Sequence, residues 1–148
     1  MSKAQTKPAF DTTHPSALAV YCSDGRFTDA VEDLLRSLGE ARLDTLTVPG
    51  GPALLDLDTA SFSELEAIRS AASFLIRGHR IKRVVLLAHE GCGFYRERMR
   101  HVAQEHVAAR QREDLARAAA WLRLTHAELS VDLYYARVSA ARVDFDLL

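Results

Sequence analysis

The stretch Val84-Val85-Leu86-Leu87-Ala88, followed directly by His89-Glu90-Gly91-Cys92-Gly93, decides the fold of this 148-residue chain. Five consecutive apolar residues without polar alternation are typical of a strand that is buried on both faces of a parallel sheet. The polar, glycine-containing segment that follows marks the point where this strand ends and the chain turns. A histidine and a cysteine therefore stand together at the carboxyl end of a buried strand.

A second apolar run ends in the same way. Residues 16–22 read Ser-Ala-Leu-Ala-Val-Tyr-Cys, and the polar segment Ser23-Asp24-Gly25-Arg26 follows. In an open parallel sheet, ligands bind outside the carboxyl ends of the strands, where the strand order reverses. If the two runs form neighbouring strands, the only two cysteines of the chain meet His89 at one edge of the sheet.

Helices alternate with strands along the rest of the chain. Apolar spacing predicts helices over 27–38, 61–77 and 96–129, and further strands over 43–48, 131–138 and, at the edge, 139–148. The charged run at 110–114 indicates a break or a solvated elbow in the last helix. This alternation predicts an α/β fold with a single domain over 15–148, a mainly parallel central sheet of four to five strands, and helices on both faces. Residues 1–14 are expected to form a flexible N-terminal arm.

Composition excludes several classes of partner. The net charge is −1, with 48% hydrophobic and 26% charged residues, so no basic excess points to nucleic acid or a membrane surface. No apolar run approaches the roughly 20 residues that span a bilayer, and the N-terminus lacks the apolar stretch of a signal peptide. We therefore expect a cytoplasmic protein, in which two separated cysteines are better explained as metal ligands or reactive thiols than as a structural disulfide.

The residues at the two strand ends form a candidate metal site. Two thiolates and one imidazole, from Cys22, His89 and Cys92, are a ligand set that zinc uses with an open fourth position. Water would take that position, or Asp24 if its carboxylate swings in. Arg26 can hold this carboxylate in a charge-assisted fork and keep it off the metal. Two plainer interpretations stay open: the cysteines as small buried hydrophobes, and Asp24 as the cap of the following helix.

The paired motifs, Cys-x-Asp-x-Arg followed by His-x-x-Cys-Gly, resemble those of the β-class carbonic anhydrases. The order of elements also resembles that fold through most of residues 16–138. The resemblance implies one Zn²⁺ per chain, with the ligands Cys22, His89 and Cys92. It further implies that Asp24 is the fourth ligand in a closed state or orients the zinc hydroxide in an open state, with Arg26 as its partner.

By this resemblance the chain is a short, divergent member of the family. Residues 1–14 do not resemble the long N-terminal helices that usually wrap a partner subunit in that family. Pro49-Gly50-Gly51-Pro52 stands where the family usually has an Asn-Ala-Gly type of loop; we expect a turn here, with N–H groups facing the site as the other option. Phe94 and Tyr95 follow the second motif directly. The resemblance also implies a homodimer or a larger homo-oligomer.

Three functions compete. The expected one is a zinc-dependent lyase that hydrates CO₂ to bicarbonate by zinc-hydroxide attack, or that hydrates a closely related small electrophile. The alternative is a non-catalytic zinc protein in which Asp24 closes a Cys₂-His-Asp site and the domain acts as a dimeric binding or regulatory module. A thiol redox protein comes third, because the cysteines are not in a Cys-x-x-Cys arrangement.

Overall fold

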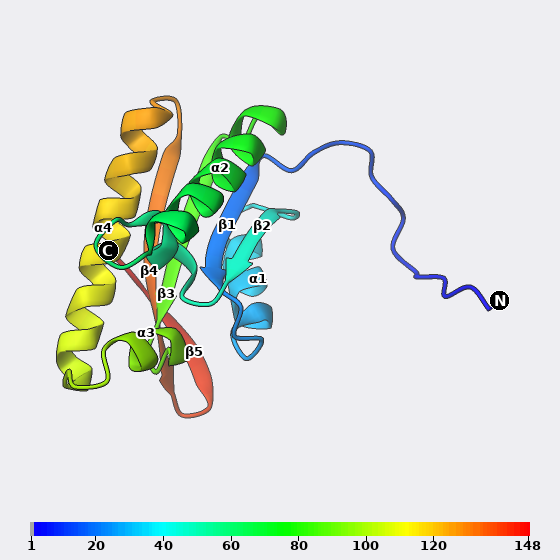
Figure 1. The fold of residues 1–148 in the computed structure, drawn as a ribbon. Coiled ribbons are helices and arrows are strands. Elements are labelled where there is room, and N and C mark those ends of the chain that lie inside the picture. The colour runs from blue at the N-terminus through cyan, green and yellow to red at the C-terminus, as the bar shows by residue number, and fades with distance from the viewer. Residues whose placement is uncertain (1) are drawn as a thin grey trace.

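The computed structural model describes residues 2–148 and contains one five-stranded sheet with helices on both faces (Figure 1). The strands are β1 (Ala17–Cys22), β2 (Asp44–Val48), β3 (Arg83–His89), β4 (Ser130–Ser139) and β5 (Arg142–Leu147). The helices are α1 (Thr28–Ser37), α2 (Phe62–Gly78), α3 (Gly93–Arg98) and α4 (Gln104–Thr125), with a 3₁₀ helix η1 (Gly51–Leu55). The strand order is β2-β1-β3-β4-β5, and only the β4–β5 pair is antiparallel. The predicted α/β class, with a mainly parallel sheet and a C-terminal edge strand, is confirmed.

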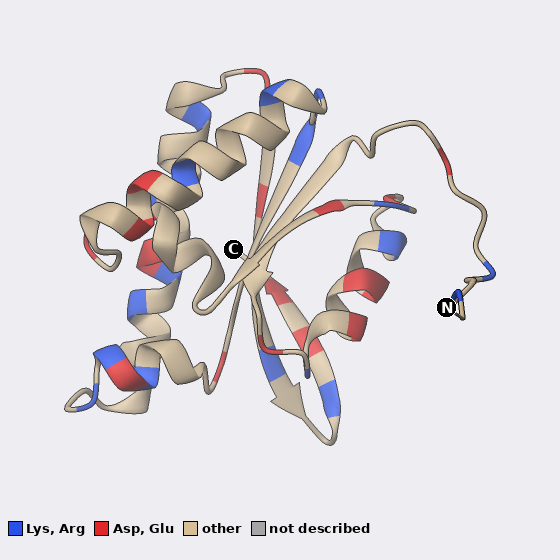
Figure 2. Cartoon of the chain, turned by 45° about the vertical axis from the view of Figure 1, so that its right-hand side comes forward, with Lys and Arg blue, Asp and Glu red and all other residues tan. Residues whose placement is uncertain are grey.

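Helices lie on both sides of the sheet, as the turned view in Figure 2 shows, and a hydrophobic cluster fills the space on each side between helices and strands. On β1, Leu18 and Val20 pack toward α2 and α4, whereas Ala19 and Tyr21 pack toward α1. Successive strand residues point to opposite faces, so a strand covered on both sides must be apolar throughout. This is why the two uninterrupted apolar runs of the sequence predict strands β1 and β3 correctly.

The predicted helix over 96–129 is wrong in one respect. The chain forms two helices, α3 and α4, and the break lies at 99–103 instead of 110–114. The charges of the second range do not interrupt α4, because Arg110 pairs with Asp114 one turn away on the same helix. The actual break contains neither glycine nor proline, so nothing in the local sequence marks it.

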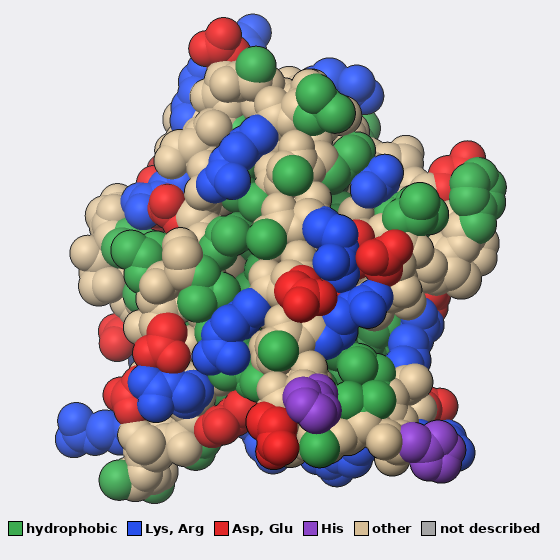
Figure 3. Space-filling view, turned by 90° about the vertical axis from the view of Figure 1, so that its left-hand side faces the viewer, with side chains coloured by type: hydrophobic (Ala, Val, Ile, Leu, Met, Phe, Trp, Pro, Cys, Tyr) green, Lys and Arg blue, Asp and Glu red, His purple; other side chains and the backbone are tan. Residues whose placement is uncertain are grey.

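The outward face of the molecule on the α4 side is mixed in charge. Basic and acidic side chains are interspersed over it, with apolar side chains between them (Figure 3). Among the described residues, no helix is both long enough and apolar enough to cross a membrane.

The arm preceding β1 has no helix or strand over residues 2–16 and extends away from the sheet (Figure 1). Its last part is tied to the domain: Arg42 forms an ion pair with Asp11 and donates hydrogen bonds to Thr13. The His14 ring stacks on His79 at a centroid distance of 3.9 Å. The flexibility of the arm stays a prediction, and Met1 lies outside the described residues.

Strands β1 and β3 separate at their carboxyl ends, and this separation makes room for a site. Their register pairs Ala17–Val20 with Arg83–Leu86 and goes no further, although β1 continues to Cys22 and β3 to His89. The chain leaves β1 for β2 on one side of the sheet and returns to β3 on the other, so the strand order reverses here. This is the point at which ligand sites form in open α/β sheets.

Candidate metal centre

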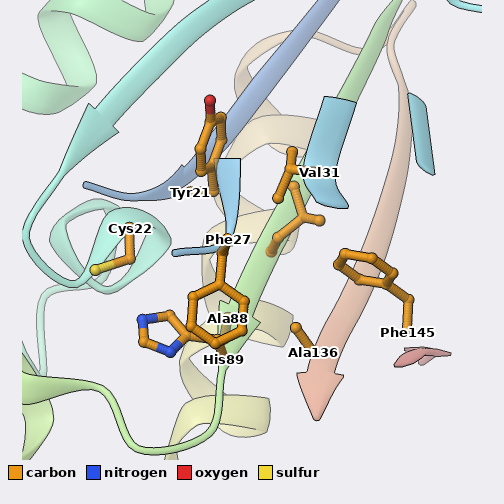
Figure 4. A pocket seen from close by; sticks show the side chains of 9 residues that line it. Tyr21, Cys22, Phe27, Val31, Ala88, His89, Ala136 and Phe145 are labelled. Carbon is orange, nitrogen blue, oxygen red and sulfur yellow. The ribbon is translucent and has the colours of Figure 1, made fainter. Parts of the chain in front are cut away.

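Three side chains converge where β1 and β3 separate. One potential ligand atom from each of Cys22, His89 and Cys92 lies within 4.8 Å of the other two, and all three residues are buried. The two sulfur atoms are 3.9 Å apart, too far for a disulfide. In Figure 4 the Cys22 sulfur and the His89 ring lie side by side, one from the end of each strand. The sequence therefore predicts this convergence correctly.

The backbone fixes which nitrogen of His89 is free. Nδ1 lies 2.8 Å from the carbonyl oxygen of Glu90, and a carbonyl oxygen can only accept, so Nδ1 donates. In the neutral ring, Nε2 then carries a lone pair. This atom is buried and has no hydrogen-bond partner in the described part of the chain. A buried nitrogen without a partner is costly unless something binds it, and metal-bound histidines typically donate their other nitrogen to a carbonyl in this way.

The two thiols influence each other's ionisation. The pKa of Cys22 is lowered, chiefly because the Cys92 thiol can donate to its sulfur, with help from the backbone N–H groups of Gly50 and Asp24. The pKa of Cys92 is raised, because it supplies that hydrogen bond and because it is buried. Without a cation, the pair therefore holds one negative charge readily and a second one poorly. A divalent cation would supply the missing compensation.

The Asp24 carboxylate, two residues after Cys22, is engaged by Arg26. Arg26 Nε is 2.9 Å from Oδ1 and Nη2 is 2.6 Å from Oδ2, which makes a fork, and the Arg26 backbone N–H donates to Oδ1 as well. This hydrogen bonding lowers the pKa of Asp24 to about 2. Asp24 is not among the three residues whose ligand atoms converge. Nor does Asp24 cap α1, because the N-cap position of this helix is Phe27 and no side chain forms a cap hydrogen bond there.

The Pro-Gly-Gly-Pro loop is more than a turn. Gly50 and Gly51 have positive φ values of 81° and 52°. A Cβ atom on Gly51 would lie 2.6 Å from the carbonyl carbon of Tyr21, so only glycine allows the loop to approach the end of β1 this closely. The approach places the Gly50 N–H where it favours the Cys22 thiolate. The loop allows two interpretations, a plain turn or a turn whose N–H groups face the site, and the position of the Gly50 N–H supports the second.

A small cavity of about 10 Å³ adjoins Cys22 and His89. The rest of its lining comes from apolar or aromatic side chains, namely Tyr21, Phe27, Val31, Leu87, Ala88, Ala136 and Phe145 (Figure 4). The Phe27 ring packs against His89 with a centroid distance of 4.2 Å. This space holds about one water molecule, so only very small molecules fit beside the group without movement of side chains.

Sequence reasoning missed three buried polar residues behind the centre. Tyr95 packs in one cluster with both cysteines, and its hydroxyl donates to Asp114 at 2.5 Å. Gln111 donates to the carbonyl oxygen of His89 at 2.8 Å. The sequence does carry a signal for Gln111. It lies midway between Val107 and Leu115 at a spacing of four residues, which places it on the buried face of α4.

These residues fit a zinc ion. Two thiolates on one tetrahedral zinc ion, each at about 2.3 Å, are about 3.8 Å apart, close to the separation observed between the two sulfurs. The free Nε2 of His89 completes a Cys₂His set, which in catalytic zinc sites leaves one position open for water or substrate. The donor set suits zinc better than magnesium or calcium, which prefer oxygen ligands.

Comparison with solved structures shows which proteins share this fold. Similar structures include the β-carbonic anhydrase CafD of the fungus Aspergillus fumigatus (TM-score 0.59, 14% identity, 97% of this chain and 94% of that chain covered). The β-carbonic anhydrase isoform I of the protozoan Trichomonas vaginalis has a TM-score of 0.57 and 11% sequence identity, with 97% of this chain and 88% of that chain covered. A tetrameric β-carbonic anhydrase of the filamentous ascomycete Sordaria macrospora has a TM-score of 0.53 and 14% sequence identity, with 90% of this chain and 81% of that chain covered. At these identities the likeness establishes a common fold.

The sequence itself identifies the family. The family described as "Putative carbonic anhydrase" matches residues 12–137, which include both motifs and all of β1 to α4. The chain belongs to this family. No curated protein sequence matches the chain.

Proposed function

We propose that this protein is a zinc enzyme that hydrates CO₂ to bicarbonate, with Cys22, His89 and Cys92 as the ligands of one Zn²⁺. Zinc in an open site of this kind lowers the pKa of a bound water to about 7 and so supplies hydroxide at neutral pH. The single observation that carries the proposal is the buried His89 Nε2, which has no partner and lies beside two thiols.

Asp24 and Arg26 have complementary roles in this proposal. The fork from Arg26 occupies both carboxylate oxygens of Asp24, which keeps the carboxylate off the metal. Asp24 remains ionised at neutral pH, because its pKa is about 2. Its carboxylate can therefore accept a hydrogen bond and orient the group that adds to CO₂.

The surroundings of the group suit a small uncharged substrate. The cavity beside Cys22 and His89 is lined almost entirely by apolar and aromatic side chains, and its size excludes all but very small molecules. CO₂ is small and nonpolar, which agrees with such a lining, and a sulfur analogue of CO₂ would share these properties. The similar solved structures reported above are β-carbonic anhydrases, which supports the same chemistry.

The test is stopped-flow CO₂ hydration by zinc-loaded protein across pH, with zinc content measured on the same samples. We expect near-stoichiometric zinc and a hydration rate well above that of buffer. Stoichiometric zinc with no hydration at any pH, together with Asp24 on the metal in a crystal structure, would favour the non-catalytic alternative. A metal-free protein purified under reducing conditions, which also fails to take up added zinc, would reject both.

We further propose that the chain forms a homodimer or a larger homo-oligomer. The edge strands β2 and β5 have one unpaired side each, and the C-terminal edge exposes Val138, Leu147 and Leu148. Exposed strand edges are usually covered or paired in native proteins. Light scattering at micromolar concentration should give at least twice the 16.4 kDa mass of one chain, and a monomer at all concentrations would contradict this expectation.

A further inference from the structure

Helix α4 presents two polar side chains to the interior, where they contact the segment of residues 89–95. Its other buried residues are Val, Leu and Ala, but Gln111 and Asp114, three positions apart, are each only 1% exposed. Polar side chains at such positions are costly unless all their hydrogen bonds are made. Each of the two makes contact with the segment between His89 and Tyr95, which contains two of the proposed zinc ligands.

We propose that Gln111 and Asp114 are positioning residues for the metal centre. The inference rests on the zinc site proposed above. Asp114 is not among the residues whose ligand atoms converge, and the Gln111 amide hydrogen-bonds to a backbone carbonyl and a tyrosine hydroxyl, so both would act through the segment that they hold. Metal ligands are commonly oriented by such outer partners, whose loss typically weakens metal binding by about 10–100-fold.

Gln111 acts on the histidine. Its Nε2 donates to the His89 carbonyl oxygen at 2.8 Å, and its Oε1 accepts from the Tyr135 hydroxyl at 3.1 Å, so both ends of the amide are fixed. On the other side of the same peptide, the N–H of Glu90 donates to the Ala136 carbonyl. The His89–Glu90 peptide is thus held at both its polar groups. The next carbonyl, that of Glu90, accepts from His89 Nδ1 and so keeps Nε2 free for a metal.

Asp114 acts on the cysteines through Tyr95. The Tyr95 hydroxyl donates to Asp114 Oδ2, and the Tyr95 ring, 2% exposed, packs in one cluster with Cys22 and Cys92. The other carboxylate oxygen is held by Arg110 at 2.8 Å and Arg117 at 2.5 Å. The carboxylate is therefore fixed from the α4 side and presents one oxygen to Tyr95. A ring fixed in this way would restrain the cluster in which both cysteines pack.

The chain offers a matched control. Thr59 also donates its hydroxyl to Asp114 Oδ2, at 2.7 Å, but it lies before α2 and is not in the cluster with the cysteines. Tyr95→Phe and Thr59→Val each remove one hydroxyl donor from the same carboxylate oxygen. A purely structural role for this network predicts similar consequences for both changes. A positioning role predicts that only Tyr95→Phe affects the metal.

The experiment measures the zinc Kd by chelator competition for wild type, Gln111→Met, Tyr95→Phe and Thr59→Val, and the melting temperature of each with and without zinc. We expect a Kd about 10–100-fold weaker for Gln111→Met and Tyr95→Phe, and a smaller zinc-dependent rise in melting temperature. Thr59→Val should stay within about twofold of wild type. If Gln111→Met does not fold, Tyr95→Phe, which keeps its ring, decides alone.

The outcomes separate this inference from the zinc site itself. If wild type does not bind zinc, the proposed function fails first. If wild type binds zinc tightly and Tyr95→Phe binds it equally well, the positioning role is wrong while the zinc site stands. If Tyr95→Phe and Thr59→Val weaken zinc binding to the same extent, the network is merely structural and the inference is also overturned.

Discussion

Cys92→Ser should remove most of the zinc from the purified protein, and Cys22→Ser should do the same. Each change replaces a thiolate by a hydroxyl that stays protonated at neutral pH and is a poor zinc ligand. The loss should exceed the roughly 100-fold that the removal of a supporting partner costs, because a ligand itself is removed. The sequence contains only these two cysteines, so no other thiol of the chain can replace either of them.

Elemental analysis and chelator competition on the same preparations provide the measurement. Glu97→Gln is a suitable control, because Glu97 follows Cys92 on α3 but its exposed side chain pairs with Arg100 instead of converging with the cysteines. It should retain full zinc. If both serine variants keep stoichiometric zinc, the ligand assignment is wrong.

Removal of the metal should also lower stability. A ligand that binds only the folded state stabilises it by about 4.1 kcal/mol when its free concentration is 1,000 times Kd. For a chain of this size, 1 kcal/mol corresponds to about 2–4 °C in melting temperature. Chelation of wild type should therefore lower its melting temperature by about 10 °C, and chelation should hardly change that of Cys92→Ser.

The sequence predicts the convergence of Cys22, His89 and Cys92 well, because Cys22 and His89 each end an apolar run and Cys92 follows His89 by three residues. Cys22 and His89 end strands that must be buried on both faces, and parallel neighbours bring such ends together. The convergence also requires β1 and β3 to be neighbours in the sheet. The sequence is compatible with this strand order but does not determine it. The pairing of Val20 with Leu86 confirms it.

The supporting residues are harder to predict, because their partners are distant in sequence. Gln111 binds the backbone of a residue 22 positions earlier, and a backbone partner leaves no trace in the sequence. The charge run at 110–114 is typical of a solvated segment, but Asp114 is buried and its charge is paired with Arg110 and Arg117 of its own helix. The Gly50 N–H could face outward or inward with the same local sequence. Its direction depends on how closely η1 packs against β1.

Arg26→Ala should abolish most CO₂ hydration while the protein keeps its zinc. In the wild type, the Arg26 guanidinium binds both oxygens of the Asp24 carboxylate. The pKa of Asp24 is about 2, so this carboxylate is ionised throughout any practical assay range. Without the guanidinium, this anion is free to bind the metal and close the fourth position. Arg36→Ala, which removes another exposed arginine that pairs with Glu32 on α1, should have no comparable effect.

Asp24→Ala should also keep its zinc and lose activity, but for a different reason. The fourth position stays open, and the group that orients the attacking oxygen is missing. The loss of a positioning group commonly costs about 100-fold in rate or more. Since Asp24 is ionised well below neutral pH, the ratio of wild-type to Asp24→Ala rates should be constant above about pH 4.

The double variant distinguishes a dyad from two independent residues. If Arg26 acts only through Asp24, then Asp24→Ala/Arg26→Ala should be as active as Asp24→Ala alone, because no carboxylate remains to be held away from the metal. Rates and zinc contents of wild type, the two single variants and the double variant complete this cycle. A double variant whose loss is the product of the two single losses, or an Arg26→Ala protein as active as wild type, would show that the two side chains do not operate as a pair.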